Sequence, residues 1–356
     1  METLSLSMLL LELLLVPSET GNEQLISNFI EDYFSDLKGF QHEKIGLSHI
    51  YQTQRIEEKK TISFYGHLDT VRNQQEIEEG ISQGKIYGCG ASDMKGGVAV
   101  MMKLISDLAE IPEAQHLYNY VFVFYDREEG PYAENGLVDV LKNCKELEKS
   151  DIAFVLEPTN NAIQVGCLGG LHAKVTFIGK SAHSARPWEG SNAIHLGWKL
   201  LSRLDGFGKK EVSLHGLQFF EVMNATMAHA GTTRNSIPPS FELNINFRFA
   251  PGKNIEDAKH EMIELIGSEP LIEFIDECPS GKVIVDNLLL QSFKDRFELN
   301  YEPKQAWTDI ARLGLHGIPA VNCGPGHPSQ AHQKNEWISE NSLNKCYENY
   351  LKFLTS

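Results

Sequence analysis

Five segments of the chain end a short apolar run, or open a glycine-rich turn, with histidine or acidic residues. They hold His67 and Asp69 after 61–65, Asp93 in 88–97, Glu128 and Glu129 after 120–125, Glu157 after 152–156, and His332 after 320–322. In open α/β sheets, ligands bind at the carboxyl ends of the strands. Imidazole and carboxylate groups gathered there would form a mixed nitrogen and oxygen site, which suits zinc and similar ions. The sequence therefore predicts an α/β sheet with a metal site at one edge.

A single segment of this kind carries little information. A lone histidine after a strand is more often a hydrogen-bonded structural residue, and an aspartate at a helix start is usually an N-cap. Repetition at five separate places makes unrelated caps and surface acids the weaker interpretation.

Charge and cysteine usage limit the partners and the compartment. The net charge of −16 argues against nucleic acid or an anionic membrane surface as a partner. The six cysteines show no C-x-x-C spacing, which predicts a reducing cytoplasm. The apolar stretch 4–16 is too short to span a bilayer and no basic segment precedes it, so we expect a buried helix there.

The length of 356 residues suits two domains. Up to residue 168, helical patterns such as 94–108 alternate with short apolar strands near 61–65, 120–125 and 152–156. This alternation is typical of a sheet covered by helices.

The pattern changes after residue 168. Strands are expected at 172–178, 219–228, 241–249 and 271–275, with helices at 191–204 and 254–266. This β-α-β-β-α-β order predicts an inserted ferredoxin-like domain at 169–282. Because His332 lies beyond it, the metal domain would be discontinuous, comprising 1–168 and 283–356.

The motifs resemble those of one known family. They are GHLDTV at 66–71, GASDMKGG at 90–97, EEG at 128–130, LEPT at 156–159, AHSA at 182–185 and NSIP at 235–238. In this order they resemble the dinuclear-zinc amidohydrolases, which include aminoacylases, glutamate carboxypeptidases, acetylornithine deacetylase and succinyl-diaminopimelate desuccinylase. Within the family, AHSARPW at 182–188, NFRFAP at 246–251 and WTDIAR at 307–312 most resemble the desuccinylases of Gram-positive bacteria. The resemblance implies a zinc-peptidase-like catalytic domain with an inserted dimerisation domain.

The resemblance also implies a set of metal ligands. Asp93 would bridge two divalent ions, most simply zinc, with cobalt as an alternative. His67 and Glu157 would complete one shell, and Glu129 and His332 the other. Each ion would then have one imidazole, one terminal carboxylate and one shared carboxylate, leaving a position for water. His332 rather than His327 matches the family's ligand position.

Two carboxylates beside these ligands are expected to act in catalysis. Asp69 would accept the second ring N–H of His67 and fix its tautomer; the alternative is a turn-forming aspartate. Glu128 would take a proton from the attacking water and give it to the leaving amine. Without the other motifs, the Glu128–Glu129 pair would be interpreted as a solvated acidic turn.

Five further residues are expected to contact substrate. By resemblance, His183 would reach the active site of the partner subunit and donate a hydrogen bond to the oxyanion, and Asn235 would donate similarly. Arg248, or alternatively Arg186, would bind a substrate carboxylate, although Arg248 could also be a surface-facing strand residue. Gly324 would offer a backbone N–H.

Together these expectations describe a cytoplasmic homodimeric enzyme that hydrolyses a small N-acyl amino acid, with succinyl-diaminopimelate as the implied substrate. Gram-negative desuccinylases carry arginines just before the inserted domain, where this chain has Cys167, Leu168, Gly169 and Gly170. Acetylornithine-type deacetylation, N-acyl amino acid deacylation and dipeptide cleavage therefore stay open. A binding protein that keeps the fold without turnover is the alternative from another class.

Overall fold

The computed structural model describes residues 4–231 and 233–356. The chain forms two compact units. The first comprises residues up to Val165, Ile284–Glu302 and Leu313–Ser356; the second comprises Gly166–Val283 and Pro303–Arg312.

The main sheet of the first unit is mixed. Its order is β1-β2-β6-β3-β7-β17-β8-β16, in which β3, β6, β7 and β17 are parallel. The strands are β1 Gln41–Ile45, β2 Ser48–Gln52, β3 Thr61–His67, β6 Asn119–Tyr125, β7 Ile152–Pro158, β8 Ile163–Cys167, β16 Tyr301–Lys304 and β17 Ala320–Gly324. A small sheet joins β4 Gly80–Ser82, β5 Lys85–Tyr87 and β18 Trp337–Ser339.

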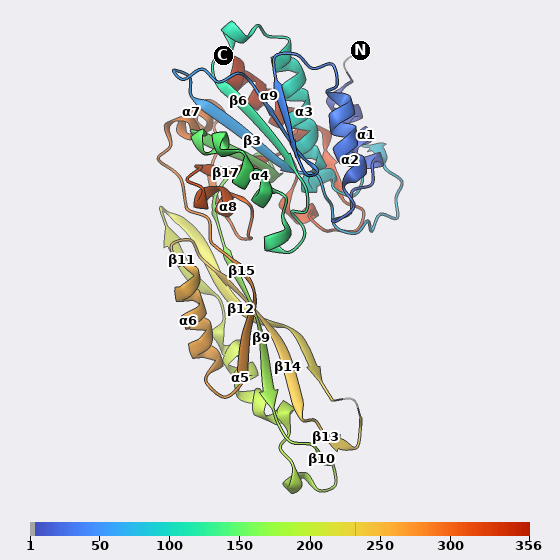
Figure 1. Ribbon diagram of the computed structural model, residues 1–356, viewed down its shortest axis with the longest axis vertical. Helices are drawn as coiled ribbons and strands as arrows, with labels where there is room; N and C mark the ends of the chain where they lie inside the picture. Colours follow the sequence, from blue (N-terminus) through green and yellow to red (C-terminus); the bar gives the residue numbers. More distant parts are fainter. Residues whose placement is uncertain (1–3, 232) are drawn as a thin grey trace. The chain divides into compact units, whose positions relative to one another are not determined.

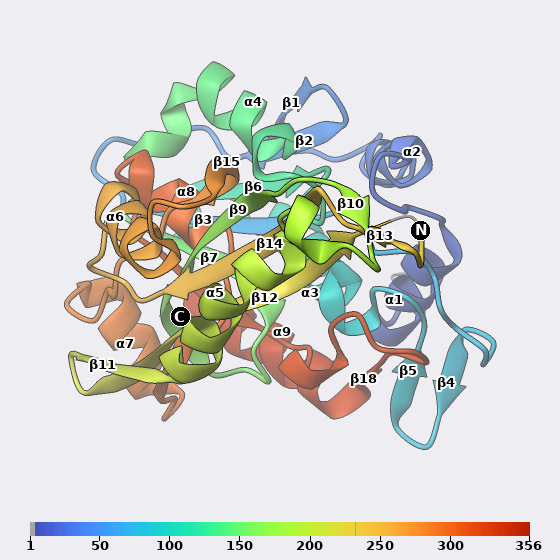
Figure 2. The ribbon, with the colours of Figure 1, turned by 90° about the horizontal axis from the view of Figure 1, so that it is seen from below.

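Helices cover both faces of the main sheet. They are α1 Leu6–Leu15, α2 Gln24–Tyr33, α3 Gly96–Ala109, α4 Leu137–Asn143, α7 Leu288–Arg296, α8 Ile310–Leu315 and α9 Glu340–Thr355. Figures 1 and 2 show α3 and α9 on one side of the sheet and α4 on the other. On the α9 side, the ring of Phe64 lies 5.1 Å from that of Tyr350. A Cβ on Gly97 would lie 2.5 Å from the Leu156 carbonyl oxygen, so only glycine lets the start of α3 pack this closely on β7.

The apolar N-terminal stretch is helix α1, and Leu9, Leu10 and Leu13 within it are fully buried. Lys95, which is itself buried, donates from Nζ to the carbonyl oxygens of Leu13 (3.0 Å) and Val16 (2.7 Å). A cation is favourable at a helix C-terminus, where carbonyl groups lack partners. Among the described residues, no helix is long and apolar enough to cross a membrane.

The second unit is a five-stranded antiparallel sheet of order β11-β12-β14-β9-β15. Its elements are β9 Gly169–Ile178, α5 Ala193–Phe207, β11 Lys210–Leu214, β12 Leu217–Ala230, β14 Ser240–Phe249, α6 Ile255–Ile266 and β15 Leu271–Cys278. A two-stranded ladder, β10 Ala182–His183 with β13 Ser236–Ile237, extends from it. Without β11, the order β12-β14-β9-β15 is the ferredoxin-like arrangement. The predicted fold class is therefore confirmed, and β11 is an addition to the expected pattern.

The unit boundaries lie within three residues of the expected ones except in one segment. Residues 303–312 group with the second unit, whereas the sequence placed all of 283–356 in the first. The amide of Gln305 exchanges two hydrogen bonds with the backbone of Phe220, and Trp307 Nε1 donates to the Pro279 carbonyl oxygen at 3.1 Å. These contacts join segments that are far apart in the sequence, so no local sequence pattern predicts them.

Candidate metal centre

The strand ends that carry the expected ligands meet at one edge of the first unit's sheet. His67 is the last residue of β3 and lies opposite Tyr125, the last residue of β6. Glu157 lies near the end of β7, the other neighbour of β3. Because these strands are parallel, their carboxyl ends bring the attached side chains together.

Two groups of three side chains form around a shared aspartate. His67, Asp93 and Glu157 make one group, and Asp93, Glu129 and His332 make the other; within each group the donor atoms lie within 4.8 Å of one another. Asp93 Oδ1 lies 3.3 Å from His67 Nε2, whereas Oδ2 lies 3.7 Å from His332 Nε2. Each carboxylate oxygen of Asp93 therefore faces a different histidine.

The outer carboxylates complete this pattern. Glu157 Oε1 lies 3.9 Å from His67 Nε2, and Glu129 Oε1 lies 2.8 Å from His332 Nε2. His327, the other histidine of this loop, accepts a hydrogen bond from the Ser329 backbone N–H instead. The five residues expected to hold metal are thus gathered in one place, and His327 has a local structural contact.

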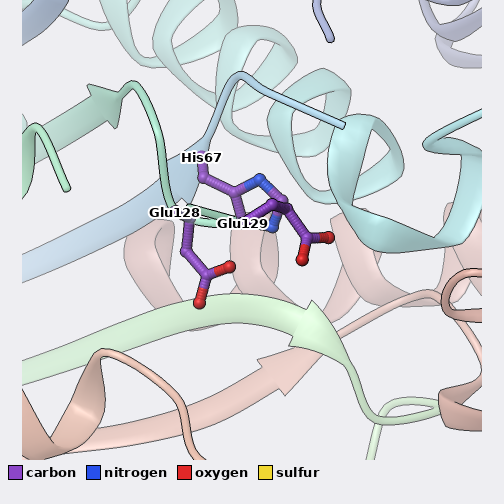
Figure 3. A group of neighbouring side chains, drawn as sticks. All are labelled: His67, Glu128 and Glu129. Carbon is purple, nitrogen blue, oxygen red and sulfur yellow. The ribbon is translucent and has the colours of Figure 1, made fainter. Parts of the chain in front are cut away.

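Glu128 belongs to a third group, with His67 and Glu129. Figure 3 shows these three side chains directed into the same space from the end of β3 and from the turn after β6. Both glutamates are partly buried. Glu128 is therefore close to the ligands while its own carboxylate belongs to neither of the two groups around Asp93.

Asp69 holds this turn in place. Its Oδ1 accepts the backbone N–H of Glu128 at 2.9 Å, and its Oδ2 accepts that of Glu129 at 3.0 Å. The hydroxyl of Thr20 also donates to Oδ2 at 3.0 Å. His67 Nδ1 lies 3.0 Å from the main-chain oxygen of Asp69 and 3.4 Å from Oδ1. The ring therefore faces Asp69, as expected, but the nearer acceptor is the backbone.

Sequence reasoning missed Thr20 and Glu336. Glu336 is buried and accepts the backbone N–H groups of Gly90, Ser92 and Asp93 at 2.7–2.8 Å. Thr20 lies shortly after a proline, and Glu336 lies in a polar segment. Neither residue follows an apolar run, which was the sequence signal that identified the other site residues.

The electrostatic field in this region is strongly negative. The Glu129 carboxylate raises the pKa of His332 to about 9. Burial by itself would lower the pKa of His67, but hydrogen bonds to Asp69 and Asp93 outweigh burial and raise this pKa well above its usual value. Burial and the charge of Asp93 raise the pKa of Glu336 to about 7. Imidazoles and carboxylates in such a field are the donor set of a divalent cation site.

Gly324 at the end of β17 has a packing role. A Cβ there would lie 2.2 Å from the Leu156 carbonyl oxygen, so the position requires glycine. Its backbone N–H donates to Thr159 Oγ1 at 3.0 Å. The N–H that was expected to meet substrate is therefore already bound within the protein.

The remaining expected residues lie in the second unit. His183 pairs with Ser236 in the two-stranded ladder, and Ser184 N donates to the Asn235 carbonyl oxygen at 2.9 Å, so His183 and Asn235 are neighbours. Both are exposed, as is Arg186, whose Nε lies 3.7 Å from Glu189.

Arg248 lies near the other end of β14, opposite Gly170 of β9. A Cβ on Gly170 would lie 2.9 Å from Arg248 Nη1, so the guanidinium occupies the space above this glycine. The side chain is half-buried on the sheet face opposite the buried residues of β14, which alternate with it. It is available on that face for a ligand.

A parallel-centred sheet with convergent imidazoles and carboxylates at its carboxyl edge, together with a ferredoxin-like second unit, defines a metallopeptidase-like amide hydrolase. Residues 63–356 match the sequence profile of peptidase family M20/M25/M40, and the chain belongs to that family. The resemblance predicted from the motifs is thus confirmed.

Named relatives agree with this assignment. The succinyl-diaminopimelate desuccinylase of Corynebacterium glutamicum is 32% identical over 332 residues, covering 90% of this chain and 88% of the relative. A putative succinyl-diaminopimelate desuccinylase of Mycobacterium tuberculosis is 30% identical over 341 residues, 95% of each chain.

Solved structures share the fold. A tripeptidase from Staphylococcus aureus superposes with a TM-score of 0.80 at 22% identity, covering 98% of this chain and 97% of its own. The Bacillus subtilis YXEP protein, described as a dinuclear metal-binding peptidase, gives a TM-score of 0.72 at 15% identity, covering 98% and 96%.

Proposed function

We propose that this hydrolase is a succinyl-diaminopimelate desuccinylase, which cleaves N-succinyl-LL-2,6-diaminopimelate into succinate and LL-2,6-diaminopimelate. The observation that carries the proposal is the Asp93 carboxylate, which presents one oxygen to each of two ligand groups. Such an arrangement suits two neighbouring divalent ions. The desuccinylase relatives, at 30–32% identity over most of the chain, support the choice of substrate.

His67 and Glu157 would hold one ion and Glu129 and His332 the other, with Asp93 between them. Zinc suits this mixture of imidazole and carboxylate donors, and cobalt is the alternative. When bound, the ions would polarise the amide carbonyl and lower the pKa of a water molecule to about 7.

Glu128 would move the proton. Its carboxylate lies beside the ligands, and the hydrogen bond from its N–H to Asp69 fixes the turn that carries it. It would take a proton from the attacking water and deliver it to the leaving amine nitrogen. A protein that only binds its ligand has no use for such a base, which argues against the non-catalytic alternative.

Arg248 would bind a carboxylate of the substrate. Its guanidinium is a planar fork that matches a carboxylate through two hydrogen bonds. Its position above Gly170, in the stretch 167–170 where Gram-negative desuccinylases carry arginines, supports this role. Arg186 is the alternative, and Asn235 and His183 would act on the carbonyl oxygen.

We further propose a cytoplasmic homodimer formed through the second unit. Residues 224–230 of β12 are exposed and, within the described chain, pair with β14 alone, because β11 ends its pairing at Glu221. Helix α5, which packs on this sheet, exposes Ile194, Leu196, Trp198 and Leu201. An open strand edge beside exposed apolar side chains suits pairing with the same edge of a second copy. Analytical ultracentrifugation tests this, and a monomer at micromolar concentration would contradict it.

The substrate assignment is tested by turnover of the zinc-loaded protein. N-succinyl-LL-2,6-diaminopimelate should give a higher kcat/KM than N-acetylornithine, N-acetyl-diaminopimelate or a dipeptide, and Glu128→Gln should strongly lower the turnover of each of them. A higher kcat/KM for an acetylated substrate or a dipeptide would contradict the desuccinylase assignment and favour another amidohydrolase activity. No turnover of any amide by the metal-loaded wild type would favour the binding protein.

A further inference from the structure

We propose that Glu336 is a positioning residue of the metal centre, which locks the loop carrying His332 to the turn carrying Asp93. This inference rests on the proposed metal centre and adds to it a residue that contacts neither metal nor substrate. Glu336 is four residues after His332 and more than 240 residues from Asp93, so it joins ligands that the sequence keeps far apart.

The carboxylate of Glu336 accepts hydrogen bonds from three backbone N–H groups of the turn that carries Asp93. Oε1 accepts the N–H groups of Ser92 (2.7 Å) and Asp93 (2.8 Å), and Oε2 accepts that of Gly90 (2.7 Å). The residue is 2% exposed, so water cannot replace these donors. The main chain of Asp93 is therefore held by a carboxylate that lies four residues after His332.

Further bonds join the same two segments. The main-chain oxygen of Glu336 accepts the Gly88 N–H at 3.0 Å, and Ser92 Oγ donates to the Trp337 oxygen at 2.9 Å. A Cβ on Gly326 would lie 2.5 Å from the Ser92 oxygen, so the backbones also touch where the loop begins. The loop and the turn form one packed body.

The backbone of the loop explains why it needs this support. His332 and Asn335 both have positive φ values, 58° and 56°. Residues other than glycine adopt this backbone conformation at a cost in free energy. His332 is also 53% exposed at its side chain, so packing alone holds it weakly. Without an anchor shortly after it, the imidazole would have many competing positions.

Only a glutamate satisfies all three donors. A carboxylate has acceptor sites on both oxygens, whereas a glutamine amide would turn its NH₂ group toward at least one backbone N–H. Aspartate keeps the charge but is one methylene shorter. Residues that orient metal ligands from behind typically change metal affinity about 10- to 100-fold when replaced.

The test measures metal binding rather than turnover. Metal-free wild type, Glu336→Gln and the control Glu340→Gln are titrated with Zn²⁺ by calorimetry and with Co²⁺ by absorption. Glu340 lies four residues further on, and its side chain accepts the Ser7 hydroxyl at 2.9 Å. We expect Glu336→Gln to bind zinc about 10- to 100-fold more weakly and to alter the Co²⁺ ligand-field bands, and Glu340→Gln to match wild type.

Circular dichroism and thermal unfolding of the metal-free proteins separate positioning from general stability. A folded Glu336→Gln with wild-type affinity and an unchanged Co²⁺ spectrum overturns the proposal, whatever its melting temperature. If Glu336→Gln does not fold, Ser92→Ala removes the hydroxyl that donates to the Trp337 oxygen and accepts the His327 N–H across the same contact. This variant should still weaken binding several-fold, and unchanged binding by it overturns the proposal. Wild-type protein that binds no ion would instead overturn the proposed metal centre, and this inference with it.

Discussion

The backbone N–H of Glu128 donates to Oδ1 of Asp69 at 2.9 Å. The residue proposed to transfer the proton is thereby fixed by the residue that also faces the ring of His67. Because the N–H of Glu129 binds the other oxygen of Asp69, one buried carboxylate sets the positions of a base and of two ligands.

The adjacent glutamates should have separable roles. In Glu128→Gln, metal content should stay near that of wild type while kcat falls by about 10²–10⁴, because a positioned acid and base is lost. In Glu129→Ala, metal occupancy itself should fall, because a ligand is removed. Metal analysis of the purified proteins, combined with kcat, checks both; equal metal loss in the two variants would contradict the division.

The Thr20 hydroxyl should matter through Asp69. Thr20→Val keeps the shape but removes the donor to Oδ2, so the Asp69 carboxylate loses one of its hydrogen bonds. We expect metal affinity to fall by about 10-fold, at the low end of the range for residues behind metal ligands. Thr20→Ser, which restores the hydroxyl, should recover wild-type affinity. If serine and valine behave alike in calorimetric titrations, the hydroxyl has no positioning role.

Arg248 should control recognition of the anionic substrate. An ammonium cannot reproduce the planar two-bond fork of a guanidinium, so even Arg248→Lys should lower kcat/KM for the succinylated substrate. The effect should be smaller on a substrate without the second carboxylate. Steady-state kinetics on both substrates checks this, and an unchanged kcat/KM for both would transfer the role to Arg186.

His183 should act on the active site of the partner subunit. Inactive His183→Ala and inactive Glu128→Gln proteins, mixed and allowed to exchange subunits, should then regain turnover. In a random mixture half of the dimers are mixed, and each of these has one site free of both lesions, so about a quarter of wild-type sites should return. The loss of an oxyanion donor typically lowers the rate by about 10²–10³. The residual activity of the unmixed His183→Ala protein should therefore be far below the recovered activity of the mixture.

Full subunit exchange must be shown independently, by mass spectrometry of labelled chains. Exchange without recovered activity would place His183 in its own subunit's site or outside catalysis.

A buried histidine outside the proposed ligand set should lower stability in mild acid. His49 is fully buried between Ser27 Oγ (2.8 Å) and His42 Nε2 (3.0 Å), and burial, with the nearby charges of Lys44 and His42, lowers its pKa to about 4. Between about pH 4 and 6.5, the unfolded state therefore binds more protons than the folded state. The contribution of His49 to the free energy of unfolding should therefore decrease as pH falls through this window, by up to about 1.4 kcal/mol per pH unit. Glu336, whose pKa is raised to about 7, contributes in the opposite sense.

Urea unfolding of metal-free protein at pH 7.0, 6.0 and 5.0 measures this slope. His49→Gln should remove the His49 contribution, so that it loses less stability than wild type, or gains more, between pH 7.0 and 5.0. The matched substitution at an exposed helical position, His260→Gln, should leave the slope as in wild type. An identical slope in all three proteins would assign the acid sensitivity to other groups.

Local patterns predicted the central strands of both sheets and the polar side chains that follow them. Apolar runs at β3, β6 and β7 and the period-two alternation of β14 mark strands, because burial on one or both faces of a sheet dictates side-chain polarity. A site at one edge of the sheet follows, since polar groups that close such runs lie together once the strands are parallel, and the family resemblance supplied the proposed ligand set. The added strand β11 was not predicted. It is short and largely exposed, so its sequence has no strong alternation of apolar and polar residues.

The sequence by itself therefore determined the central strands of the two sheets and the histidine and acidic side chains that follow them. The tertiary structure alone decided what holds those atoms in place: Thr20 beneath Asp69, Glu336 behind Asp93, and Thr159 on the N–H of Gly324. It also decided that 303–312 returns to the second unit. The physical reason is that a hydrogen bond between distant segments depends on the complete path of the chain, whereas strand and helix periodicity depends on a few neighbouring residues.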